Sequence, residues 1–153
     1  MRRKIFFLVT CIACLASAAC RSSHPLDQKV SAAVENYVDV KKEMYANPDM
    51  EKLTMVATSN EVQTLFPLLQ ALKSCDSVMK TEMKCTVEEA RLGSSGDSAT
   101  VQTRECWKYW WEDRSTGKVT RNEKVENYCL EYNLVKDDCG IWRVDRIRSL
   151  EEI

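Results

Sequence analysis

The segment Tyr128–Leu134, with the sequence YCLEYNL, decides the fold. Large apolar or aromatic side chains occupy every second position, and Cys, Glu and Asn fill the positions between them. Successive side chains of a strand point to opposite faces of a sheet. The alternation therefore predicts a strand with one buried and one wetter face.

Further strands are expected on both sides of this segment, because short turns rich in Gly, Ser and Asp divide the sequence there. These turns are expected at Gly93–Asp97, Ser115–Gly117 and Asp137–Gly140. The expected strands are Lys84–Leu92, Ala99–Glu112, Glu123–Lys136 and Ile141–Ile147. Four strands joined by such short turns form an antiparallel meander.

Residues 30–74 have a different, helical periodicity. Apolar positions from Val30 onward fall on one stripe of an amphipathic helix, and Asn47-Pro48-Asp49 separates it from a short helix over Met50–Ala57. Thr58-Ser59-Asn60-Glu61 has the pattern of a capping box and opens a third helix, in which Pro67 is expected to cause a kink or a division. Helices followed by strands predict an α+β fold, with the N-terminal helices on the concave face of a curved four-stranded antiparallel sheet.

The N-terminus has the composition of a secretory signal. A basic start is followed by an apolar run from Ile5 to Ala16 and by small residues up to Cys20. The run is too short for a retained membrane span, which needs roughly 20 apolar residues. We expect a signal peptide over residues 1–19, a tether over 20–29 and one domain over 30–153.

The approach to Cys20 resembles a bacterial lipobox, in which the cysteine becomes the lipid-modified first residue. Ser17 departs from that pattern, which usually has an aliphatic residue three places before the cysteine. The expectation is a lipid-anchored protein facing the periplasm or the cell exterior, and a freely secreted protein is the alternative.

Charge and the single histidine exclude several functions. Without its signal the chain has 19 basic and 23 acidic residues, so it lacks the basic face that nucleic-acid binding needs. His24 lies in the tether and is not held against a nucleophile or a metal. No catalytic constellation, metal site or cofactor is expected.

Export favours disulfides among the remaining cysteines. A hairpin turning near Gly117 places Cys106 and Cys129 opposite each other or one position apart, so this pair is the first choice. Cys75–Cys85 is the second choice, and Cys85–Cys106 competes with both.

An aromatic run marks the second expected strand. Trp107, Tyr109 and Trp111 share one face of it, while Trp110 lies on the other face with Cys106 and Lys108. The first set either packs beneath the helices or forms a surface for a protein partner or an apolar ligand.

The chain from about Val30 to Ile147 resembles the intermembrane-space (IMS) domain of the chloroplast division protein ARC6 and its bacterial relatives, which have an NTF2-like cone. The resemblance lies in Leu53-x-x-Val56-Ala57-Thr58, in Ser95-Gly96-Asp97-Ser98-Ala99-Thr100-Val101, and in the ending Tyr132-Asn133-Leu134 with Gly140-Ile141-Trp142-Arg143-Val144. It implies a non-enzymatic module that engages a protein partner or itself outside the cytoplasm. The alternative is a ligand-binding or SnoaL-like enzyme that uses the cavity of the cone.

Two charged groups complete the candidates. Glu88, Glu105 and Glu131 lie on expected strands and would serve as acid–base groups if they met in the cone, although strand carboxylates are more often solvated. Arg143, Arg146 and Arg148 resemble a basic patch, but acidic neighbours dilute it.

The lipid anchor can be tested directly. We predict that the mature protein begins at Cys20 and carries acyl chains there, so intact mass spectrometry of membrane-extracted protein should show the added lipid mass. A soluble product that begins near Ala19 or Cys20 without this mass would contradict the anchor and leave export standing.

Overall fold

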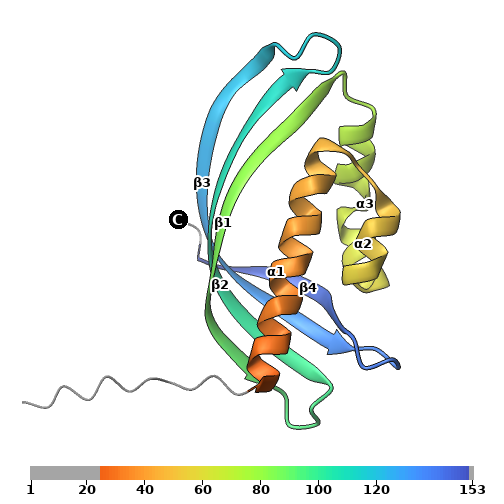
Figure 1. Ribbon diagram of the computed structural model, residues 1–153, viewed down its shortest axis with the longest axis vertical. Coiled ribbons are helices and arrows are strands. Elements are labelled where there is room, and N and C mark those ends of the chain that lie inside the picture. The colour runs from red at the N-terminus through yellow and green to blue at the C-terminus, as the bar shows by residue number, and fades with distance from the viewer. Residues whose placement is uncertain (1–24, 152–153) are drawn as a thin grey trace, which may run out of the picture.

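A computed structural model of the protein describes residues 25–151, so His24 and Cys20 lie outside the described residues. Three helices come first in the chain and pack on one side of a curved sheet (Figure 1). They are α1 (Pro25–Ala46), α2 (Met50–Val56) and α3 (Ser59–Lys73). None of the helices between residues 25 and 151 is long and apolar enough to cross a membrane.

The sheet is an antiparallel meander in the order β1-β2-β3-β4. Its strands are β1 (Ser77–Leu92), β2 (Ser98–Asp113), β3 (Val119–Lys136) and β4 (Trp142–Glu151). Gly117 ends the β2–β3 turn with a φ of +68°, which a glycine adopts without strain. The predicted fold class, helices followed by a curved four-stranded antiparallel sheet, is confirmed.

The decisive segment behaves as its alternation predicts. Tyr132 and Leu134 are buried on the concave face, which the helices cover, and Val101 and Val144 join them from the neighbouring strands. Helix α1 contributes Val34, which is fully buried in the same core. One hydrophobic core therefore lies between the helices and the concave face.

Several elements are longer than predicted. Helix α1 begins at Pro25, five residues before the expected start, and proline suits a first helical position because its missing N–H is not needed there. Strand β1 begins at Ser77 instead of Lys84, and β3 begins at Val119 instead of Glu123. The sheet therefore extends well beyond the core.

The expected capping box at the start of α3 does not form. Thr58 is the N-cap, but its hydroxyl donates to Asp145 and its backbone N–H donates to the carbonyl of Val144 in β4. Because β4 takes that N–H, Glu61 is free to bond elsewhere. Pro67 lies inside α3, which continues undivided to Lys73.

Packing of α2 gives a stability prediction with an internal control. Leu53 is fully buried, whereas Met55, two residues away, is 67 % exposed. Leu53→Ala should lower the free energy of unfolding by about 2–5 kcal/mol, because it leaves a cavity in the core. Met55→Ala should change it by less than about 0.5 kcal/mol. Chemical denaturation of both variants checks this, and equal effects would contradict the packing.

Candidate functional site

The space between the helices and the concave face of the sheet is the cone of this fold. The carboxyl group of Glu105 is buried in it, on the concave face of β2. Its side chain is 1 % exposed. The Trp107 indole N–H donates to Oε2 at 2.7 Å, while the hydroxyls of Thr103, at 3.0 Å, and Tyr132 donate to Oε1. Both oxygens are thus satisfied by protein donors, which is what allows a carboxyl group to be buried. We call these four residues the Glu105 hub.

A second buried pair joins two helices above the hub. The Tyr37 hydroxyl of α1 donates to Glu61 of α3 at 2.6 Å, and the Tyr37 ring packs edge-on against Tyr132 with centroids 5.9 Å apart. Burial raises the pKa of Glu61, while the hydrogen bond from Tyr37 and the charge of Lys41 act in the opposite direction. Burial also raises the pKa of the Tyr37 and Tyr132 hydroxyls. This pair therefore ties α1 and α3 to the sheet.

Lys41 is the cation of this region. Its amine lies 5.7 Å from the ring centroid of Trp107 and 5.9 Å from that of Tyr37. Burial lowers its pKa, and the carboxyl groups of Glu105 and Glu61 partly offset that effect. No ion pair within 4 Å is formed by its amine among the described residues.

A half-open cavity of about 490 Å³ lies above Trp107, between α1, α3 and the upper half of the sheet. We call it the aromatic groove, because four aromatic side chains form much of its wall. It is lined by Lys41, Tyr45, Leu68, Met79, Thr81, Trp107, Tyr109, Glu126, Tyr128, Leu130 and Ile147. Tyr45 packs edge-on against Trp107, with ring centroids 5.6 Å apart.

Charged and hydroxyl groups on β3 form one rim of the groove. Lys124 and the Tyr128 hydroxyl both donate to Glu126, and these bonds lower the pKa of Glu126 to about 2. Burial and the neighbouring Glu126 raise the pKa of Tyr128 to about 12. The rim therefore carries a fixed carboxylate beside a neutral phenol.

The predicted aromatic surface is only partly brought together. Trp107 and Tyr109 line the groove, whereas Trp111, on the same face, lies farther along the strand under the guanidinium of Arg121, 5.3 Å from its ring. Trp110 lies on the convex face, where its indole donates to Glu112 at 2.8 Å. The expected division of these aromatics between two faces is confirmed.

The three strand carboxylates do not meet. Glu105 alone is on the concave face. Glu88 pairs with Arg104, and Glu131 pairs with Arg148 on the convex face. Acidic partners dilute the basic patch, since Arg143 pairs with Asp137 at 2.9 Å and Arg148 pairs with Glu131. Alternation along the strands therefore separates the side chains of Glu88, Glu105 and Glu131, and the condition that they meet in the cone is not fulfilled.

The predicted disulfides are not formed, and the thiols of Cys75, Cys85, Cys106, Cys129 and Cys139 are free. Cys106 lies opposite Asn127, and Cys129 lies opposite Arg104, so the two cysteines are diagonal neighbours. Cys75 precedes β1 and Cys85 lies eight residues beyond its start, about 26 Å along an extended strand. Cys85 faces the helices and Cys106 faces away, which also separates the competing pair. Burial raises the pKa of the Cys85 thiol to about 12.

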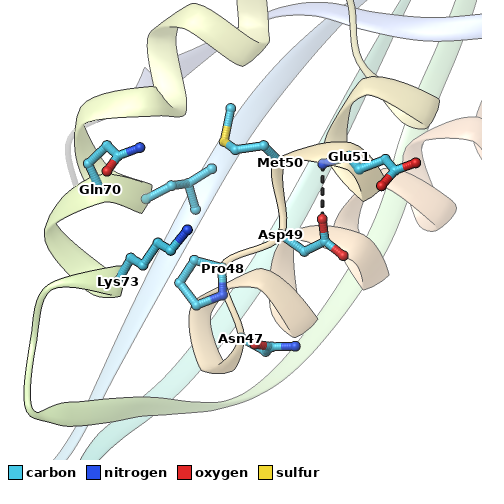
Figure 2. A pocket seen from close by; sticks show the side chains of 8 residues that line it. Asn47, Pro48, Asp49, Met50, Glu51, Gln70 and Lys73 are labelled. Carbon is cyan, nitrogen blue, oxygen red and sulfur yellow. Dashed lines mark hydrogen bonds between the residues drawn. The ribbon is translucent and has the colours of Figure 1, made fainter.

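Three further pockets within residues 25–151 lack the aromatic wall of the groove. No group of three or more His, Cys, Asp or Glu side chains within residues 25–151 is placed to hold a metal ion. Figure 2 shows a separate pocket of about 330 Å³ between the α1–α2 connection and α3. Asp49, on its wall, already accepts the backbone N–H of Glu51 as the N-cap of α2.

Sequence reasoning missed Lys41, Glu61 and the rim of β3. A signal for Lys41 was present, because it lies four residues after Tyr37 and four before Tyr45, on the stripe that faces the core. A charged residue at such a position indicates a functional or buried role. Glu61 gave no separate signal, because its residue type also fits the capping box.

Comparisons with known proteins give the class of the fold. No protein-family model matches the sequence, and no curated protein is similar to it. The structure is similar to the intermembrane-space region of the chloroplast protein ARC6, with a TM-score of 0.70 and 14 % identity over 82 % of this chain and 97 % of that one. A ketosteroid isomerase-like protein from Erwinia carotovora atroseptica has a TM-score of 0.57 and 15 % identity, over 84 % of this chain and 99 % of that one.

An NTF2-like protein involved in plasmid conjugation is also similar, with a TM-score of 0.53 and 11 % identity, over 84 % of this chain and 50 % of that chain. At such identities the similarity shows the fold alone. The chain has an NTF2-like fold, and the predicted resemblance to the ARC6 IMS domain is confirmed at the level of that fold.

The Tyr37–Glu61 pair predicts a pH effect. A buried carboxyl group with a raised pKa binds more protons in the folded state, so its contribution to stability is present at low pH and is lost as pH rises through the folded pKa. Glu61→Gln should therefore gain stability relative to wild type as pH rises above 4.5, the ordinary pKa of a glutamate carboxyl group. Denaturant unfolding of both proteins across pH 4–8 checks this. A difference that stays constant, or changes in the opposite direction, would contradict the buried pair.

Proposed function

We propose that this protein is an exported, non-enzymatic binding module, held at a membrane through Cys20, that engages a protein partner through the aromatic groove. The observation that carries the proposal is that the Glu105 hub fills the inner part of the cone, while aromatic side chains line the groove at its opening. Glu105, the carboxyl group beneath the groove, is 1 % exposed and has donors on both oxygens. A group so enclosed does not reach a substrate as a general acid or base.

The groove has the properties of a binding surface. Trp107, Tyr109, Tyr45 and Tyr128 present large, stiff side chains, and such residues contribute strongly to protein interfaces. The apolar Leu68 extends this surface onto α3, where it is 41 % exposed. A half-open shape suits an inserted side chain or segment of a partner. The fold is consistent with a place outside the cytoplasm, since the similar ARC6 region is an intermembrane-space region.

Lys41 favours a second candidate, a module that binds a small amphipathic anion. Its amine lies on the groove wall without a close ion pair, beside the apolar faces of Trp107 and Tyr37. A carboxylate with an apolar body would place its charge there and its hydrocarbon against the aromatic wall. The fold is shared with a ketosteroid isomerase-like protein, which is the fold-level argument for a small ligand.

A photo-crosslinking residue placed in the groove tests the main proposal. Tyr109 lines the groove, and its neighbour Trp110 lies on the opposite face of the same strand, so the two positions form a matched pair. In the intact cells that produce the protein, the residue at position 109 should yield a specific cross-linked protein that position 110 does not.

Equal yields at both positions would contradict a groove that binds proteins. Native mass spectrometry of the extracted protein separates the second candidate, because a retained small molecule lost in Lys41→Met would indicate an anion ligand. An unchanged bare mass would exclude that candidate.

A further inference from the structure

The aromatic groove contains one cation that the protein does not neutralise by a direct contact. Its lining includes two charged side chains, Lys41 on the wall and Glu126 on the rim. Glu126 already accepts hydrogen bonds from Lys124 and from the Tyr128 hydroxyl, so its charge is matched within the protein. Between residues 25 and 151, no hydrogen bond or ion pair involves the amine of Lys41.

This amine is accessible from the groove. Lys41 as a whole is half-buried. No side-chain nitrogen or oxygen of the described chain is both fully buried and without a hydrogen-bond partner, so the unpaired amine is exposed to the open space that Lys41 lines. A donor in that position is available to a ligand that enters the groove.

The surroundings of the amine favour an anion. It lies 5.7 Å from the ring centroid of Trp107 and 5.9 Å from that of Tyr37. Burial lowers the pKa of Lys41, and the carboxyl groups of Glu105 and Glu61 act in the opposite direction. These two residues are 1 % and 3 % exposed and bonded within the core, so neither extends into the groove. A carboxylate that entered the groove would raise the pKa of Lys41 further, so its binding and the protonation of Lys41 support each other.

The wall beside Lys41 is apolar. Leu68 of α3, which is 41 % exposed, and the half-buried Met79 of β1 line the groove together with Trp107. A carboxylate alone would leave these side chains in water. A ligand that also carries a large apolar group removes that surface from water and gains free energy by doing so.

The half-open shape favours a segment of a protein chain over a small molecule. Sites for small ligands enclose about 70–90 % of the ligand surface. The groove is open along one side, so a chain can lie in it and continue beyond both of its ends. An internal acidic side chain of a partner can therefore reach Lys41 without a chain terminus.

We propose that the partner segment carries an aspartate or glutamate beside a large apolar side chain, and that the ammonium group of Lys41 binds its carboxylate. The apolar side chain packs against Leu68 and Met79. This inference rests on the proposed protein-binding function of the groove and adds the chemistry of the partner. A segment with an amide in place of the carboxylate leaves Lys41 without a counter-charge and binds more weakly.

Photo-cross-linking in the producing cells tests the role of Lys41. With the photo-reactive residue at position 109, Lys41→Met should lower the yield of the cross-linked protein about tenfold, as expected for the loss of a half-buried charge pair. Lys41→Arg keeps the charge and should keep the yield. Lys42→Met is the matched control, because the Lys42 side chain is 41 % exposed and lies 3.9 Å from Asp39, outside the groove lining.

A second measurement leaves the fold of this protein untouched. The cross-linked segment is identified by mass spectrometry and made as two peptides, one with its native acidic residue and one with the corresponding amide. The native peptide should bind the wild-type protein about tenfold more tightly than the amide peptide. Lys41→Met should bind the two peptides with affinities that agree within about twofold, because the charge pair is already lost.

The outcomes separate this inference from the function on which it rests. No cross-link at position 109 in the otherwise wild-type chain would contradict the protein-binding groove, and this inference with it. A cross-link that Lys41→Met leaves unchanged, or that Lys41→Arg loses to the same extent as Lys41→Met, would overturn only the role of the charge. A cross-linked segment without aspartate or glutamate, or equal affinities of the two peptides for wild type, would overturn the chemistry of the partner.

Discussion

The fold depends on burying one carboxyl group, that of Glu105, on the concave face of the sheet. Leaving such a group without partners inside a protein costs several kcal/mol, so its donors must be in place when the core closes. Trp107 and Thr103 flank it on β2, and Tyr132 reaches it from β3. A slip of one residue between these strands would turn Tyr132 to the opposite face, so the hub fixes the register of the whole meander.

The same constraint shapes the groove. With Glu105 enclosed beneath the Trp107 indole, the cone is filled at its bottom, and the remaining space opens towards the upper sheet. The Tyr37 ring packs edge-on against Tyr132, and the Tyr37 hydroxyl donates to Glu61 on α3. These two contacts together set the distance between the helices and the sheet. Lys41 then lies on the wall between the buried polar groups and the aromatic mouth. The shape of the groove thus follows from the way the buried polar groups of the core form their hydrogen bonds.

Periodicity predicted the architecture because it records which side chains avoid water. The alternation through Tyr128–Leu134 placed the faces of β3 correctly, and the change of period after Ser74 separated helices from strands. Details that depend on partners distant in sequence were not predictable. The backbone N–H of Thr58 donates to the carbonyl of Val144 in β4 and not to the side chain of Glu61. Glu61 instead accepts the hydrogen bond from Tyr37. The expected cysteine pairs do not face each other for a related reason. Strand β1 starts before Cys85, and the β2–β3 register sets Cys106 opposite Asn127.

A double-mutant cycle on the hub tests the account most directly. Unfolding free energies of wild type, Glu105→Met, Tyr132→Phe and the double variant give the coupling between the two side chains, because methionine keeps the size of the side chain and lacks the carboxyl acceptor. A buried hydrogen bond of the kind described predicts a coupling of about 0.5–1.5 kcal/mol. Additive effects, with a coupling within about 0.3–0.5 kcal/mol of zero, would mean that Tyr132 does not serve Glu105 and that the hub does not fix the register.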